Sequence, residues 1–144
     1  MEDHNFIGTW KLVSSEFRRS DGTIAYPYGD DAIGLLIYTS TGHMAVQLLR
    51  ANRPVFAAGD PHRGTPEEIK AAFEGYIAYF GSYEVNTVDG IVTHHVHGAS
   101  FPNWIGGDQQ RFFELAGNQL ILSTPLILVG NATLTGVLIW ERVA

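Results

Sequence analysis

The chain has 144 residues, 45% of them hydrophobic and 17% charged, which is typical of one globular domain over residues 1–144. The formal net charge of −6 disfavours a nucleic-acid partner, which needs a concentrated basic surface, and the absence of cysteine excludes disulfides, thiolate nucleophiles and Cys-ligated zinc. No stretch reaches the ~20 apolar residues of a membrane span, and MEDHNF is followed by no apolar run of the kind found in signal peptides, so we expect a cytoplasmic protein.

Turn signals recur along the chain and separate runs rich in β-branched and aromatic residues, which predict strands. About eight strands are expected, near residues 8–19, 33–40, 43–50, 81–86, 91–99, 108–115, 119–124 and 133–143. Their short connections indicate antiparallel hairpins. The sequence therefore predicts an all-β fold with one helix, in which a closed antiparallel up-and-down β-barrel of about eight strands is filled with side chains or holds one small ligand. A two-sheet sandwich is the alternative.

The one predicted helix lies in TPEEIKAAFEGYIAYF, residues 65–80. Thr65 is the expected N-cap, and Glu68 completes a capping box. Apolar residues then recur at helical spacing and form one broad stripe. We expect a helix over residues 66–80 that packs over the barrel, after a long loop, residues 51–64, that crosses the barrel mouth. The stripe consists of Ile69, Ala72, Phe73, Tyr76, Ile77 and Phe80.

Motifs in the first and last predicted strands resemble those of a known family. IGTWKLVSSE, residues 7–16, places Gly8, Thr9 and Trp10 at the start of the first strand, and LIWERV ends the last. Together with GLLIYTSTGHM, VTHHVHGASFPNWIGGDQQRFFEL and LILSTP, these motifs make nearly the whole chain similar to the lipocalin-like domain family, small stand-alone calycin-type proteins. The resemblance implies a barrel in which Trp10 contacts Arg142 at the closed end. It implies no single activity, because related folds include carriers and cofactor-free enzymes of natural-product pathways.

Three of the six histidines fall in THHVHG, residues 93–98. Pairing of the two strands around the turn NTVDG places Tyr83 opposite His94, on a face that otherwise carries valines and should point inward. His95 and His97 fall on the polar face, which should meet solvent. Two imidazoles at this spacing can chelate zinc, but no third ligand has a recognisable spacing. We therefore expect no metal.

The segment DQQRFFEL, residues 108–115, adds polar groups to the expected interior. The apolar face that Phe113 defines also carries Gln109 and Arg111. A buried guanidinium needs a partner, because its desolvation is costly. Two partners stay open: the carboxylate of Glu16, which points inward if the first strand alternates strictly, or the oxygen atoms of a ligand.

A further candidate is Tyr38, because a phenol offers an apolar body with a polar tip. Alternation does not decide which face of residues 33–50 lines the cavity. The candidate ligand-binding residues are Tyr38, Tyr83, His94, Gln109, Arg111 and Phe113.

Three functions fit these residues. The first is a cofactor-free binding protein, monomeric or homodimeric, that holds one small, mostly hydrophobic molecule inside the barrel. The second is a cyclase, isomerase or dehydratase without a cofactor, acting on a natural-product-like substrate, with His94 moving a proton, Tyr83 assisting and Arg111 stabilising an oxyanion. The third is a structural domain with a filled barrel. Binding is placed first, because no acid–base pair or nucleophile motif has a recognisable spacing.

Overall fold

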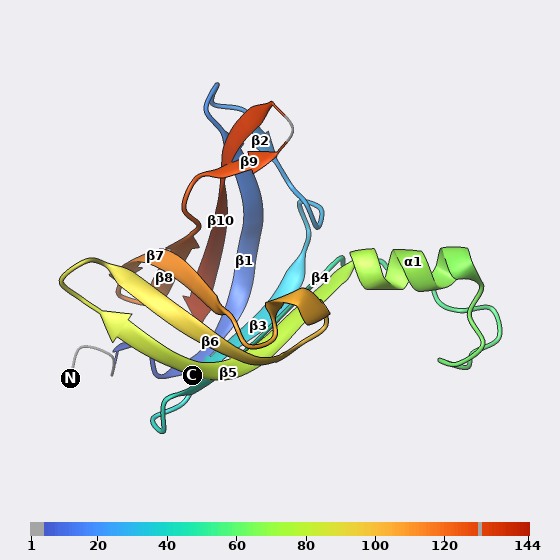
Figure 1. Cartoon of the computed structure of the whole chain (residues 1–144), viewed down its shortest axis with the longest axis horizontal. Helices are drawn as coiled ribbons and strands as arrows, with labels where there is room; N and C mark the ends of the chain where they lie inside the picture. Colours follow the sequence, from blue (N-terminus) through green and yellow to red (C-terminus); the bar gives the residue numbers. More distant parts are fainter. Residues whose placement is uncertain (1–4, 130) are drawn as a thin grey trace.

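The computed structural model describes residues 5–129 and 131–144, and antiparallel strands dominate this part of the chain (Figure 1). The barrel strands are β1 (Gly8–Arg19), β3 (Ile33–Tyr38), β4 (His43–Leu49), β5 (Tyr76–Asn86), β6 (Ile91–Ala99), β7 (Asp108–Ala116), β8 (Gln119–Ser123) and β10 (Ala132–Arg142). Each pairs with the next in this order, and β1 also pairs with β10, which closes the barrel. Two short strands that the sequence did not predict, β2 (Ile24–Ala25) and β9 (Ile127–Val129), flank β1 and β10. The predicted closed barrel is confirmed.

One end of the barrel is closed by Trp10. The indole is fully buried, and its Nε1 donates to the carbonyl oxygen of Phe6 at 3.0 Å. The guanidinium of Arg142 lies over the ring, 4.2 Å from its centroid, and donates to the carbonyl oxygens of Asn5 and Ile7. A cation over an indole face is attracted by the negative face of the ring. The expected contact between Trp10 and Arg142 is confirmed.

The hairpin of β5 and β6 has the predicted register, with Tyr83 opposite His94. His94 is buried, whereas His97 is exposed. A bulge interrupts the register next to Gly81, where the two backbones come so close that a Cβ atom would lie 1.7 Å from the carbonyl oxygen of His95. Only glycine fits at such an approach.

The helix is shorter than predicted. Helix α1 (Pro66–Glu74) begins with the expected capping box of Thr65 and Glu68 and ends at Gly75. From Tyr76 onward the chain is strand β5, whose pairing with β4 satisfies its backbone groups. The apolar residues after Gly75 fit both the helical and the strand period, and the glycine ends the helix before them. Within the described ranges, no helix has the length and apolar character needed to cross a membrane.

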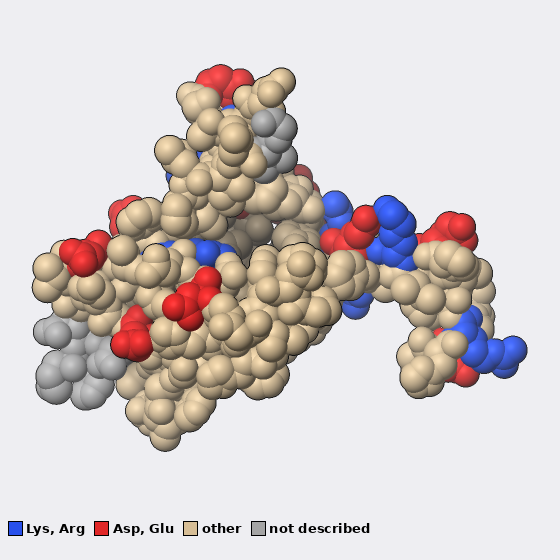
Figure 2. All heavy atoms as spheres, in the orientation of Figure 1, with Lys and Arg blue, Asp and Glu red and all other residues tan. Residues whose placement is uncertain are grey.

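Helix α1 and the loop before it form an arm, residues 51–75, that projects away from the barrel (Figure 1). None of its helical residues is buried, and Ile69 and Phe73 are 52% and 50% exposed. Acidic and basic side chains both cover the arm (Figure 2). The arm is held together internally, for example by Glu68, whose carboxylate accepts from the backbone N–H of Ala57 at 2.9 Å. The expectation that the helix packs over the barrel is therefore wrong.

Candidate ligand-binding cavity

A cavity of about 230 Å³ lies inside the barrel, beyond the packed layer around Trp10. Figure 2 shows this face of the molecule hollowed between the end that carries β2 and β9 and the strands β5 and β6. Most of the wall is apolar: Phe17, Pro27, Leu36, Val46, Leu48, Ile77, Trp104, Leu122, Ile127, Gly136, Val137 and Leu138. Residues with polar groups also line it, namely Ser15, Glu16, Tyr28, Tyr79, His94, Arg111, Thr124 and Trp140.

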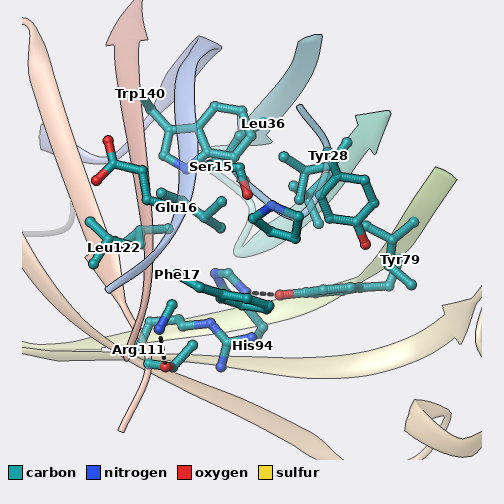
Figure 3. Close-up of a pocket in the computed structure, with 18 of the residues that line it drawn as sticks. Ser15, Glu16, Phe17, Tyr28, Leu36, Tyr79, His94, Arg111, Leu122 and Trp140 are labelled. Carbon is teal, nitrogen blue, oxygen red and sulfur yellow. Dashed lines mark hydrogen bonds between the residues drawn. The ribbon is translucent and has the colours of Figure 1, made fainter. Parts of the chain in front are cut away.

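His94 and Tyr79 line the cavity and belong to a chain of three hydrogen-bonded side chains, which Tyr38 completes beneath them. The Nε2 atom of His94 lies 2.6 Å from the hydroxyl oxygen of Tyr38. Its Nδ1 atom lies 2.6 Å from the hydroxyl oxygen of Tyr79, and Figure 3 shows this second hydrogen bond. These side chains come from β6, β3 and β5, so the chain joins three strands across the barrel interior. Both ring nitrogens of His94 are engaged. The hydrogen-bonding requirements of the two phenols therefore determine which ring nitrogen carries the hydrogen.

Burial keeps all three groups of this chain neutral. Desolvation, and secondarily the nearby Arg111 guanidinium, lowers the pKa of His94 to about 3. Desolvation raises the pKa of Tyr79 to about 12 and raises the pKa of Tyr38 well above its ordinary value. Removing a charged form from water disfavours it, which lowers the pKa of a base and raises that of an acid. A neutral imidazole therefore lies between two protonated phenols at physiological pH.

Arg111 reaches the cavity wall from β7 without a carboxylate partner among the described residues. Its guanidinium donates to the side-chain oxygen of Gln109 at 3.0 Å and to the carbonyl oxygen of Gln110 at 2.8 Å. The carboxylate of Glu16 instead accepts from Arg18 at 2.9 Å. The alternative in which Glu16 neutralises Arg111 is therefore wrong.

A β-bulge explains this error. The pairing of β1 with β10 shifts between Leu12 and Ser14, so Val13 has no partner. An extra residue of this kind exchanges the two faces of a strand from that point on. Ser15, which is 4% exposed, and Phe17 take the inward positions, whereas strict alternation assigns them to Ser14 and Glu16.

Trp140 supplies an uncommitted donor in the cavity wall. The residue is fully buried, yet its Nε1 atom has no hydrogen-bond partner among the described residues. In Figure 3 the indole nitrogen lies on the lower edge of the ring, nearer to the other labelled side chains of the cavity. Buried polar groups are almost always paired, so an unpaired N–H in a cavity wall requires an explanation.

The structure brings two of the six sequence-predicted site residues to the cavity wall, His94 and Arg111. The other four face inward but contact these two or the packed core. Tyr38 hydrogen-bonds to His94, and Gln109 accepts from Arg111. Tyr83 donates to the Thr39 carbonyl oxygen, and Phe113 packs edge-on against Phe6 with ring centroids 4.9 Å apart.

Sequence reasoning missed Tyr79 and Trp140. Tyr79 was missed because the predicted helix extended to residue 80. A helix that ends at Gly75 instead places Tyr79 in a strand, on the same inward face as Ile77. Trp140 had a clearer signal. Alternation back from Arg142, expected at the closed end, puts Trp140 and Leu138 on the same inward face.

The outer face of β6 carries a second polar group outside the cavity. His95 lies 2.6 Å from a carboxylate oxygen of Glu84 and 2.8 Å from one of Asp108. Hydrogen bonds to Asp108 and then to Glu84 raise the pKa of His95 above its ordinary value. The described residues contain no group of three or more potential ligands placed to hold a metal ion.

These features define a closed antiparallel barrel with an internal apolar cavity and a few convergent polar groups. A family model described as a lipocalin-like domain matches residues 7–143, and the chain belongs to this family. It is also similar to the 4'-hydroxy-3'-methoxypropiophenone carrier protein ppsC of Aspergillus oryzae, with 35% identity over 95 residues, which cover 60% of this chain and 86% of that protein. No solved structure gives a significant match to the chain.

Proposed function

We propose that this protein binds one small, mostly hydrophobic molecule inside the barrel. The observation that carries the proposal is the cavity of about 230 Å³, whose wall is mostly apolar and includes the polar groups of Tyr79, His94, Arg111 and Trp140. Ligand sites in proteins commonly combine an apolar wall with a small number of placed polar groups. The similarity to a protein named as a carrier of an aromatic ketone supports the same role and suggests a ligand of comparable size.

The chemistry of His94 favours a carrier over a proton-transfer enzyme. A general acid or base works best with a pKa near the operating pH. Burial lowers the pKa of His94 to about 3, and both its ring nitrogens are already bonded to tyrosine hydroxyls. In this state the imidazole organises the floor of the cavity and has no free nitrogen to offer a substrate.

The proposal is tested by titrating the protein with 4'-hydroxy-3'-methoxypropiophenone in a calorimeter. We expect saturable binding of one molecule per chain. Replacing Leu138 in the cavity wall by tryptophan should fill the space and weaken binding by about tenfold or more, since a blocked site loses its apolar contacts. The matched control is Val88→Trp, at a site that is 93% exposed, which should bind like the unmodified protein. Absence of saturable binding, or equal affinity in Leu138→Trp, contradicts the proposal.

A further inference from the structure

We infer that the residues of the cavity wall include two uncommitted hydrogen-bond donors, the O–H group of Tyr79 and the buried Nε1–H group of Trp140, and that the ligand therefore carries a hydrogen-bond-accepting oxygen such as a ketone carbonyl. The inference rests on the proposed function and deepens it, because it names the chemical class of the ligand.

The first donor follows from Trp140 alone. An indole nitrogen can donate a hydrogen bond but cannot accept one. This N–H is fully buried, belongs to a residue of the cavity wall and meets no acceptor in the described part of the chain. A buried donor without a partner costs free energy, and an acceptor atom in the cavity removes that cost.

The second donor follows from the position of one proton on His94. A neutral imidazole has one N–H donor and one acceptor nitrogen, so one neighbouring phenol must donate to the ring while the other accepts from it. The hydroxyl of Tyr38 is buried away from the cavity, and among the described residues its hydrogen-bond partner is Nε2 of His94. If Nε2 carried the hydrogen, the hydroxyl hydrogen of Tyr38 would be buried without an acceptor.

The structure therefore assigns the hydrogen of His94 to Nδ1, with Tyr38 donating to Nε2. Nδ1–H then donates to the hydroxyl oxygen of Tyr79 at 2.6 Å. That leaves the hydroxyl hydrogen of Tyr79 without an acceptor among residues 5–129 and 131–144, on a side chain that lines the cavity (Figure 3). Tyr79 is 9% exposed and its raised pKa keeps the phenol protonated, so it remains a donor across the physiological range.

Arg111 gives the same wall a positive charge, which also favours an oxygen that bears partial or full negative charge. Glu16 also borders the cavity, but its carboxylate is committed elsewhere, since it accepts from Ser14 and Arg18 at 2.9 Å each. The hydroxyl of Ser15 can either donate or accept. The polar groups of the cavity wall are thus mainly hydrogen-bond donors.

The experiment compares two probes that differ only in the acceptor: 4'-hydroxy-3'-methoxypropiophenone and 2-methoxy-4-propylphenol, in which a methylene group replaces the carbonyl. Calorimetry on the unmodified protein should give about tenfold tighter binding of the ketone. Trp140→Phe or Tyr79→Phe should reduce this preference, and the double variant should abolish it. Tyr76→Phe, which removes a hydroxyl bonded to Gln47 outside the cavity, is the control and should retain it.

A second measurement needs no substitution. In protein labelled with ¹⁵N at histidine, long-range ¹⁵N–¹H correlation spectra should show His94 as the neutral tautomer with its hydrogen on Nδ1. The Nε2–H tautomer overturns the assignment of Tyr79 as a donor. Equal affinity for the two probes overturns the inference while leaving the proposed function intact. Failure of both probes to bind contradicts the proposed function, and the inference falls with it.

Discussion

The two halves of the barrel interior arise from the same alternating strands but differ in how they are filled. In the closed half, Phe6, Trp10 and Tyr38 are at most 1% exposed, and the aromatic rings of Phe6 and Tyr38 meet edge to face with centroids 5.3 Å apart. In the other half, small residues such as Ser15 and Gly136 take wall positions, and a cavity of about 230 Å³ remains. The His94 chain lies at the boundary between them.

This contrast shows that barrel closure and cavity formation are set by different residues. Closure follows from the register of eight strands and from Trp10 and Arg142. The cavity follows from side-chain size on the inward face. The two halves should therefore respond differently to equivalent changes.

The largest difference is expected for truncations of the core. Trp10→Ala should lower the free energy of unfolding by about 3–5 kcal/mol, because it empties a fully packed site. Leu138→Ala should cost only about 1–2 kcal/mol, because that side chain already borders open space and loses mainly its transfer free energy. Guanidinium unfolding followed by circular dichroism measures both. Equal costs would contradict the division into a packed half and a cavity half.

The next largest effect is the pH dependence of stability caused by His94, which lies between the two halves. The pKa of His94 is lowered from 6.5 to about 3 in the folded protein, so its stabilising contribution is complete above about pH 6.5 and is lost as the pH falls. As the pH falls from 6 to 4, protonation of this single histidine in the unfolded chain should lower the free energy of unfolding by about 2–3 kcal/mol, at about 1.4 kcal/mol per pH unit.

The measurement is the difference in unfolding free energy between the unmodified protein and His94→Gln as a function of pH. The control is His95→Gln on the outer face. Because hydrogen bonds to Asp108 and Glu84 raise the pKa of His95, its contribution is present at low pH and is lost as the pH rises through that value. Parallel pH profiles for the unmodified protein and His94→Gln would contradict the buried, neutral state of His94.

A smaller effect should separate the two phenols that flank His94. Tyr38→Phe leaves Nε2 of the imidazole without a partner in a fully buried place and should cost about 1–3 kcal/mol. Tyr79→Phe leaves Nδ1 facing the cavity, where water can replace the lost hydroxyl, and should cost about 1 kcal/mol or less. Thermal unfolding of the two variants side by side compares them. A larger cost for Tyr79→Phe than for Tyr38→Phe would contradict the placement of Tyr38 in the packed half and of Tyr79 at the cavity.

The smallest effect is expected in the arm. Phe73 is 50% exposed in a helix that has no buried residue, so Phe73→Ala should change the unfolding free energy by about 0.5 kcal/mol or less. Guanidinium unfolding measures this change. A loss comparable to that of a core truncation would show that the arm packs against the barrel in solution.

The fold was predictable because its signals are local and repeated. Turn residues bound the strands, and the hairpin around NTVDG fixed the register of Tyr83 and His94 without further information. The end of the helix was harder, because apolar residues after Gly75 satisfy two periods at once. Only the pairing of β5 with β4, which connects residues far apart in the chain, decides between them.

The site was predictable only in part. Alternation in β6 and β7 correctly turned His94 and Arg111 inward, since neither strand has a bulge before these residues. It failed along β1, where the unpaired Val13 shifts the pattern and removes Glu16 from the expected pair with Arg111. The hydrogen bonds to Tyr38 and Tyr79 join strands from different hairpins, and no spacing in the sequence encodes such contacts.

The unpaired Val13 also determines where the barrel tolerates a change of length. Deleting it yields a regular strand in which Ser15 and Phe17 still point inward, because the deletion removes the one residue that interrupts the alternation. A deletion of Gln110 in β7 has the opposite consequence, since that strand has no surplus residue and its later side chains exchange faces. A one-residue deletion at Val13 therefore leaves the cavity wall unchanged. The same deletion in a strand without a bulge moves side chains of the cavity wall to the outer surface.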